Sequence, residues 1–188
     1  MNDNMLIEIV KDKEKIYKGA ILDVQKWTVT LANGQDAARE IVIHKGASAV
    51  VPVDEEGNVY LVRQFRTPFE KIMLEIPAGK LDFAGEDRLV CAKRELREET
   101  GFTAGSWLHL MDMATTPGFC NELISLYLAR DLKKGETDFD DDEFLDLVKM
   151  PLKDAVNMVQ KGEIQDGKTA LAILMANARL LMEENENA

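Results

Sequence analysis

Apolar and polar residues alternate over much of the first quarter of the chain, and this pattern predicts β-strands. The strands are expected at residues 6–10, 21–31 and 39–44, with a turn at Asn33-Gly34. Asn-Gly between two alternating segments is the strongest short-range sign of a hairpin. Few windows here have helical periodicity, and so short a set of strands needs a larger body to pack against. We therefore expect residues 1–46 to form a β-strand region that packs on the remaining residues, 47–188, or on another chain.

The remaining residues mix strands with helices. Leu89, Ala92 and Leu96 form an apolar stripe at helical spacing, and Gly101 can end that helix in the left-handed conformation. Strands alternating with helices predict an α+β or α/β domain. The pattern predicts a second hairpin from 47–53 and 58–65, further strands at 107–114, 123–129 and 144–148, and helices at 151–161 and 168–182.

Three glutamates lie beside the apolar stripe of the first helix. Glu95, Glu98 and Glu99 stand at i, i+3 and i+4, so a helix brings them to one side, where their charges repel unless something positive lies among them. Magnesium binds a few carboxylates and completes its coordination with waters and phosphate oxygens. The pattern thus indicates a metal site for a phosphate-bearing substrate, or else a solvated helix face with Arg94 paired to Glu98.

Composition narrows the function further. The chain has 188 residues and a formal net charge of -11, which argues against nucleic acid as a partner. The two cysteines, Cys91 and Cys120, suggest neither a disulfide framework nor a zinc site. No apolar run is long enough to span a membrane, and residues 1–4 lack the basic start of a signal peptide, so we expect a cytoplasmic protein.

The residues around the glutamates resemble the signature box of the Nudix hydrolases. Gly79 and Glu86 are followed at the family's distances by the run from Arg94 through Glu99 to Gly101, except that six residues separate Gly79 from Glu86 where the pattern has five. The extra residue falls in the turn-like stretch 83–85, where an insertion is tolerated. The resemblance implies an α+β fold, an α/β/α sandwich around a mixed sheet, with the N-terminal strands as an antiparallel β appendage.

The same resemblance implies roles for the box residues. Glu95 and Glu99 would be the principal metal ligands, with Glu98 assisting and the backbone carbonyl of Ala78 completing a site for Mg²⁺, or alternatively Mn²⁺. Glu86 would orient Arg94, which requires Glu86 to lie in the loop before the helix, because eight residues along a helix are too far apart. The structural members of the box would be Gly79, Glu86, Arg94 and Gly101.

Within the family, the chain is similar to the enzymes that hydrolyse ADP-ribose to AMP and ribose 5-phosphate. Pro117 lies sixteen residues after Gly101, and residues 62–66 and 74–80 also match that subgroup. The subgroup implies a homodimer in which the N-terminal strands pack across the partner. Two alternatives remain: hydrolysis of another nucleoside diphosphate sugar such as GDP-mannose, and a non-catalytic module that senses a nucleotide sugar.

Several substrate contacts follow from the subgroup. Trp27 would stack on adenine, Arg39 and Glu40 would touch the nucleotide, and the cations of Arg66 and Lys80 would serve the phosphates. Trp27 could instead cover the core, and Arg39 could be a surface charge on a strand.

A catalytic base must come from outside the box. In the subgroup it comes from an acidic loop ahead of a late strand, here residues 138–144. We predict Glu143 as the base because its side chain is longer than those of its aspartate neighbours, with Asp141 as the alternative and Glu98 as a further catalytic carboxylate. A solvated acidic loop is the other interpretation, and no glycine is placed as an EF-hand would require.

Overall fold

The structure is a computed structural model that describes residues 3–135 and 145–186. The chain divides into two compact units. Unit 1 comprises Met1–Gly46 and Ala114–Glu122, and unit 2 comprises Ala47–Met113 and Leu123–Ala188. No helix among the described residues combines the length and apolar character that crossing a membrane requires.

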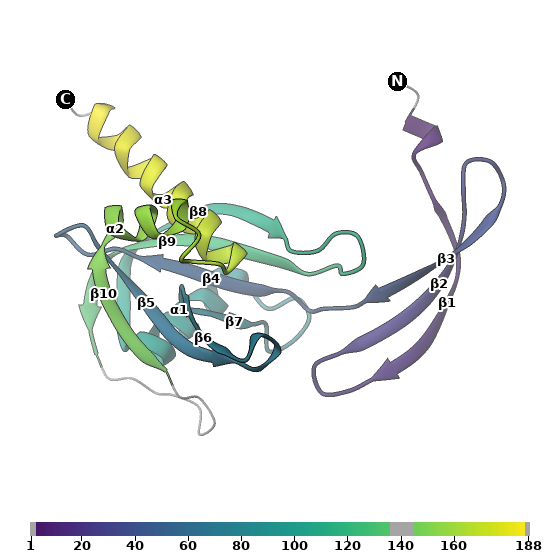
Figure 1. Cartoon of the computed structure of the whole chain (residues 1–188), viewed down its shortest axis with the longest axis horizontal. Coiled ribbons are helices and arrows are strands. Elements are labelled where there is room, and N and C mark those ends of the chain that lie inside the picture. The colour runs from purple at the N-terminus through teal and green to yellow at the C-terminus, as the bar shows by residue number, and fades with distance from the viewer. Residues whose placement is uncertain (1–2, 136–144, 187–188) are drawn as a thin grey trace. The chain divides into compact units, whose positions relative to one another are not determined.

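Unit 1 is built on a three-stranded antiparallel sheet in the order β1-β2-β3 (Figure 1). Its elements are the short 3-10 turn η1 (Asp3–Met5), β1 (Ile9–Lys18), β2 (Asp23–Thr30) and β3 (Asp36–Val42). The predicted turn is present, with Gly34 at a φ of 81°. The strand expected at 6–10 is misplaced and too short, because β1 continues through a charged stretch that has no apolar face to reveal it.

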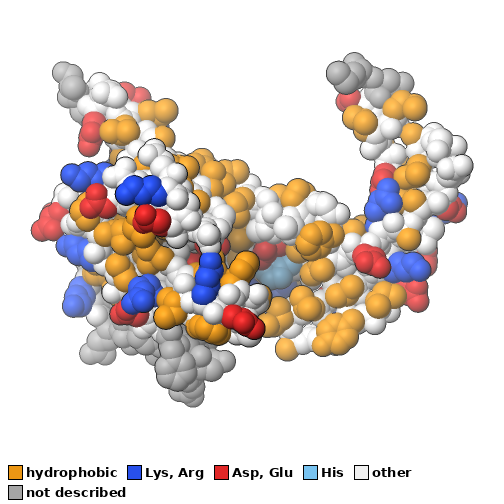
Figure 2. Space-filling view, viewed as in Figure 1, with side chains coloured by type: hydrophobic (Ala, Val, Ile, Leu, Met, Phe, Trp, Pro, Cys, Tyr) orange, Lys and Arg blue, Asp and Glu red, His pale blue; other side chains and the backbone are white. Residues whose placement is uncertain are grey.

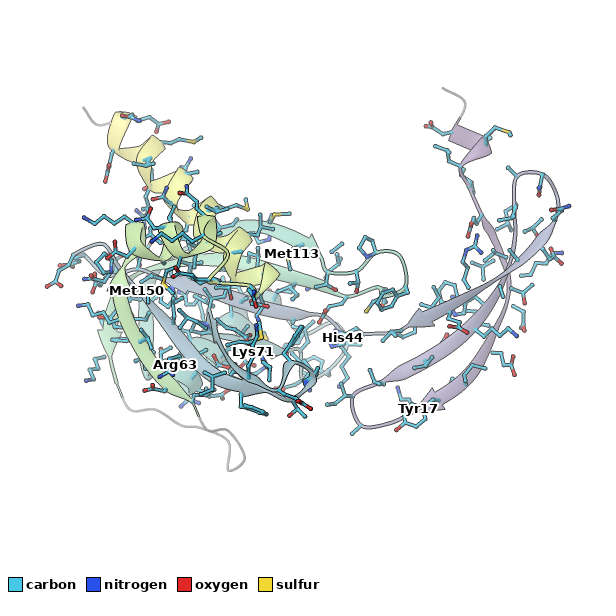
Figure 3. The ribbon with its side chains drawn as sticks, in the orientation of Figure 1. Tyr17, His44, Arg63, Lys71, Met113 and Met150 are labelled. Atoms are coloured by element: carbon cyan, nitrogen blue, oxygen red, sulfur yellow. The ribbon has the colours of Figure 1, made fainter. Side chains whose placement is uncertain are left out.

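Unit 1 buries little apolar surface by itself. Every residue of β1 is exposed, and Val29 is the one buried hydrophobic residue among those described in this unit. Apolar side chains consequently lie on the surface of this sheet (Figure 2), among them Tyr17 of β1, which is 56% exposed (Figure 3). Such a sheet has unsatisfied apolar surface to cover.

The described residues of unit 2 form two sheets and three α-helices. Its strands pair in the orders β7-β4-β9-β8 and β10-β5-β6 (Figure 1). The elements are β4 (Ala47–Pro52), β5 (Asn58–Arg66), the turn η2 (Thr67–Phe69), β6 (Lys71–Glu75), β7 (Ala78–Lys80), α1 (Arg88–Thr100), β8 (Phe102–Ala114), β9 (Leu123–Lys134), β10 (Asp146–Pro151), α2 (Leu152–Gln160) and α3 (Gly167–Glu186).

The centre of unit 2 is a sheet covered on both faces. β4 and β9 run parallel, and their side chains alternate between two apolar clusters. Val50 and Tyr127 face Leu96 of α1, whereas Val51 and Leu126 belong to the cluster that includes α2 and α3. The predicted α/β/α sandwich around a mixed sheet, with its antiparallel N-terminal strands, is confirmed.

One predicted pairing is wrong. Residues 47–53 and 58–65 do form strands, but β4 and β5 do not make a hairpin ladder and share a single isolated bridge between Val53 and Val59. β4 pairs instead with β7 and β9, and β5 pairs with β6 and β10. The uniformly buried residues of β4 are typical of a central strand with both faces covered, and its two neighbours, antiparallel β7 and parallel β9, come from elsewhere in the chain.

Candidate active site

Helix α1 is bounded by residues that satisfy its ends. The carboxylate of Asp87 accepts the backbone N–H groups of Leu89 and Val90, each at 2.9 Å. At the other end Gly101 has a φ of 72°, and its N–H donates to the carbonyl of Arg97 at 2.8 Å. The helix therefore starts after Glu86 and stops where the sequence predicted.

The three glutamates of the box lie along one edge of α1. Glu95 and Glu99 are buried, at 8% and 3% exposure, and Glu98 is half-buried. Burying a carboxylate is costly unless a hydrogen bond or an opposite charge compensates it. The residues around this edge must therefore supply hydrogen bonds or positive charge to the carboxylates.

Arg94 supplies a positive charge between two of these carboxylates. Its Nη1 lies 2.6 Å from Glu95 Oε1 and 3.2 Å from Glu98 Oε2. Burial by itself would lower the pKa of Arg94, but Glu95, together with Asp82 and the other groups around the guanidinium, raises it. The i,i+4 pair with Glu98 that the sequence left open is thus present, and it shares its guanidinium with the buried Glu95.

The short strand β7 lies against the other side of the carboxylates. The N–H of Ala78 donates to Glu99 Oε2 at 3.1 Å. A Cβ atom on Gly79 would lie 2.0 Å from the Glu95 carboxylate, so only glycine lets this strand approach so closely. Ala78 and Gly79 therefore orient the two buried glutamates from the backbone side.

The loop before α1 completes the surroundings of Arg94. Glu86 lies in this loop, as its predicted pairing required, and its Oε2 is 3.8 Å from Arg94 Nη2. The same oxygen accepts the N–H of Asp82 at 2.7 Å, and the carboxylate of Asp82 lies 3.5 Å from Arg94. Glu86 thus both shapes the loop and faces the guanidinium. Lys80 is exposed, and its carbonyl oxygen accepts a hydrogen bond from Arg94 at 3.1 Å.

A second charged group, which the sequence did not single out, lies at the end of β6. The carboxylate of Glu75 is 2% exposed and accepts hydrogen bonds from Arg66 Nε and Nη2, each at 2.7 Å, and from Lys168. Burial favours the protonated form, but the two cations outweigh it and lower the pKa of Glu75 to about 2. A glutamate inside the apolar run 74–77 was the signal that could have indicated this pair.

The depressed pKa of Glu75 predicts a pH-dependent contribution to stability. Because the folded-state pKa is about 2 and the ordinary value is 4.5, ionised Glu75 stabilises the folded state above pH 4.5, and this stabilisation is lost as the pH falls toward 2. We expect the difference in Tm between the wild type and Glu75→Gln to be largest near neutral pH and to shrink over that acidic range. Thermal scans of both proteins by circular dichroism test this, and a constant difference would contradict it.

Three predicted nucleotide contacts lie in unit 1. Cross-strand pairing places Lys13, Trp27 and Arg39 in line on one face, with Lys13 Nζ 3.9 Å from the Trp27 ring centroid. Trp27 is half-buried and donates its indole N–H to Gln25 at 2.9 Å. Arg39 pairs with Glu8.

The structure does not bring all predicted contacts together. Glu40 is exposed and follows Arg39 along a strand, so it projects from the opposite face. Asp141 and Glu143, the predicted base and its alternative, lie outside the described residues. Cys91 has a buried thiol, and burial followed by Glu95 raises its pKa to about 11, which is unsuited to a nucleophile.

The box residues fit a hard divalent cation by their donor chemistry. Glu95, Glu98 and Glu99 offer carboxylate oxygens from one helix edge, and two of them are buried beside backbone that excludes bulkier groups. Within residues 3–135 and 145–186, no three acidic, histidine or cysteine side chains already converge as a metal cage. Glu95 and Glu98 are instead ion-paired to the guanidinium of Arg94.

An α/β/α sandwich that carries a carboxylate-lined helix behind a glycine loop defines a class of hydrolases, and comparison with known proteins agrees. The family model described as the NUDIX domain matches residues 43–172, and the chain belongs to this family. It is a NUDIX hydrolase, and such hydrolases generally need divalent metal ions.

Relatives and a solved structure cover most of the chain. A "Methanol dehydrogenase activator" of Bacillus methanolicus is 44% identical, covering 85% of this chain and 87% of the relative. An "ADP-ribose pyrophosphatase" of Bacillus subtilis (strain 168) is 42% identical, with shares of 86% and 88%. A "GDP-mannose pyrophosphatase" of Enterobacter sp. (strain 638) is 30% identical, with shares of 90% and 94%. A crystal structure of an "ADP compounds hydrolase" has the same fold, at a TM-score of 0.82 and 21% identity, covering 94% of this chain and 95% of that one.

Proposed function

We propose that this protein hydrolyses the diphosphate bond of ADP-ribose to give AMP and ribose 5-phosphate, using magnesium. The observation that carries the proposal is the pair of buried carboxylates, Glu95 and Glu99, set against the backbone of Ala78 and Gly79. The substrate choice is supported by 42% identity to an ADP-ribose pyrophosphatase, compared with 30% to a GDP-mannose pyrophosphatase.

The proposed reaction is the attack of water on one phosphorus atom. The water oxygen forms the new P–O bond, the bridging oxygen leaves with the other phosphate, and the proton of the water passes to Glu143 or Asp141. When bound at the box carboxylates, a divalent cation supplies charge neutralisation for the phosphate oxygens. Glu95 and Glu99, with Glu98 assisting and the carbonyl of Ala78 completing the set, would hold it.

The chain's other residues orient these groups. Arg94 holds Glu95 and Glu98 at 2.6 and 3.2 Å, and the N–H of Ala78 holds Glu99 at 3.1 Å. The guanidinium of Arg66 pairs with Glu75 and also interacts electrostatically with Glu99, so it would supply a cation for a phosphate oxygen. Lys80 would add a second, exposed cation.

Unit 1 would bind the adenosine end of the substrate. Trp27 presents an indole for stacking on adenine, and one of its faces is already covered by Lys13. Arg39, with Glu40 on the opposite face of the strand, would contact the nucleotide. The exposed apolar surface of unit 1 supports a homodimer in which this sheet packs on a second copy of the chain.

A panel of nucleoside diphosphate sugars tests the proposal. With magnesium present, we expect ADP-ribose to be cleaved with the highest kcat/KM, AMP and ribose 5-phosphate to appear in equal amounts, and chelation to stop the reaction. The panel includes GDP-mannose and ADP-glucose, with products separated by anion-exchange chromatography. If GDP-mannose is cleaved faster than ADP-ribose, the assignment of ADP-ribose as the substrate is wrong. If no compound is cleaved, a non-catalytic nucleotide-sugar sensor is favoured.

A further inference from the structure

Among the residues that the structure describes, the most deeply buried ion pair outside the NUDIX box centres on Glu75. This residue ends β6, three positions before Ala78, and its carboxylate receives the side-on fork of Arg66 through Nε and Nη2 at 2.7 Å each. The third partner is Lys168, near the start of α3. A carboxylate that accepts three charge-assisted hydrogen bonds has little freedom to move.

The start of α3 anchors this ion pair. Asp166 Oδ2 lies 3.0 Å from Lys168 Nζ and accepts the backbone N–H of Thr169 at 3.0 Å. The hydroxyl of Thr169 in turn accepts the N–H of Ile76 at 2.9 Å. Glu75 is therefore fixed from the backbone as well as through its side chain, and the two acidic groups balance the two basic ones.

The guanidinium of Arg66 faces two ways. Its Nε and Nη2 edge is committed to Glu75, which turns Nη1 away from that carboxylate. The Arg66 side chain is 40% exposed although its partner is only 2% exposed, and it interacts electrostatically with Glu99 of the box. A buried ion pair of this kind is rarely the most stable choice, because well-packed apolar residues often do as well. The ion pair instead holds a fixed cation on Glu75, three residues ahead of Ala78, whose N–H contacts Glu99 at 3.1 Å.

We propose that Glu75 is a positioning residue, which holds the guanidinium of Arg66 in the orientation that binds a diphosphate oxygen beside Glu99. Glu75 itself touches no substrate. The proposal rests on the function proposed above and extends it by assigning the binding energy for the diphosphate partly to a carboxylate, through the arginine that it orients. Removing the charge of Glu75 frees the guanidinium to rotate and also leaves Lys168 with a changed partner.

A double-mutant cycle tests this role. Glu75→Gln removes the charge of the carboxylate, Arg66→Lys keeps the cation but removes the fork, and the third variant carries both changes. We expect each single variant to raise KM for ADP-ribose and Kd for ADP by about 10- to 100-fold, the usual range for residues that orient a functional group. The KM and Kd of the double variant are expected to be no higher than those of the more impaired single variant, because both changes disrupt the same orientation.

Glu183 offers a matched control. Its carboxylate also lies between two cations, Arg130 at 2.8 Å and Arg179 at 3.0 Å, but it belongs to the C-terminal half of α3. Glu183→Gln is expected to keep the wild-type KM and Kd. If Glu75→Gln does not fold, as judged by circular dichroism, Glu75→Asp retains the charge, shortens the arm, and is expected to raise KM and Kd in the same direction.

The outcomes separate this proposal from the function on which it rests. Effects of Glu75→Gln and Arg66→Lys that multiply in the double variant would show independent roles and overturn the proposal, as would unchanged KM and Kd in Glu75→Gln. If the wild type does not cleave ADP-ribose, the proposed substrate is wrong, and the cycle is then decided from calorimetric affinities for ADP with magnesium. If the wild type neither cleaves ADP-ribose nor binds ADP, both the proposed function and the proposed role of Glu75 are overturned.

Discussion

Glu99→Gln is expected to lower kcat for ADP-ribose by about 10²- to 10³-fold, because a cation held by this carboxylate contributes several kcal/mol to stabilising charge in the transition state. Glutamine keeps an oxygen that can accept the N–H of Ala78, so the local packing at 3% exposure is retained. The measurements are kcat at saturating magnesium and the affinity for Mn²⁺ from water proton relaxation. Both should fall while Tm changes little.

Substitutions of two further glutamates serve as a comparison and a control for Glu99→Gln. Glu98→Gln is expected to have a smaller effect, because Glu98 is half-buried and assists the other two carboxylates. Glu184→Gln changes an exposed glutamate of α3 in the same chemical way and should leave both kcat and Mn²⁺ affinity as in the wild type. If Glu99→Gln retained wild-type kcat and Mn²⁺ affinity, the assignment of Glu99 as a ligand would be wrong.

Gly79→Ala is expected to abolish most activity without unfolding the protein. The added Cβ would lie 2.0 Å from the Cδ and Oε1 atoms of Glu95, and the group that can move is the far end of that flexible side chain rather than backbone. The Glu95 carboxylate would therefore be displaced from its place beside Arg94. We expect kcat/KM to fall by about 10²-fold, the scale associated with a misplacement of about 1 Å in an active site.

Gly167→Ala is the control for this substitution. Nothing lies within 4 Å of a Cβ atom placed on Gly167, and alanine is favoured over glycine in a helix. This variant should keep full activity and a Tm at or slightly above that of the wild type. A Gly79→Ala protein with wild-type kcat/KM would show that the Glu95 carboxylate does not need its present position.

The sequence predicted α1 well because its signals are local. The apolar stripe, the acidic edge and the left-handed stop at Gly101 all lie within about four turns of one helix, and each acts over three or four residues. The position of Glu86 in the preceding loop was expected instead from the family resemblance, which pairs Glu86 with Arg94, and the two side chains lie 3.8 Å apart.

Pairing between strands was less predictable because it depends on distant residues. The turn at residues 54–57 suggested a hairpin, yet β4 finds its partners at Leu123–Lys134 and Ala78–Lys80. β7 itself was not predicted, since three residues that include a glycine carry no strand periodicity. The tertiary pairing overrode the local signal.

In the candidate site, too, local features were predicted from the sequence and contacts between distant residues were not. The box carboxylates were found from spacing, whereas the partnership of Glu75 with Lys168 joins residues far apart in sequence and has no short motif. The predicted role of Arg66 near phosphates did not reveal that its guanidinium is held by a buried carboxylate. The base predicted at Glu143 or Asp141 stays a prediction.

The pairing of Arg94 bears on whether the fold depends on a divalent ion. Its guanidinium lies between Glu95 and Glu98, and the N–H of Ala78 meets Glu99, so each acidic group of the helix has a partner within the chain itself. We therefore expect the chain to fold without a bound ion, unlike a zinc finger, whose folding free energy comes from the metal. Fluctuating supply of divalent ions would thus switch its chemistry on and off while its scaffold persists.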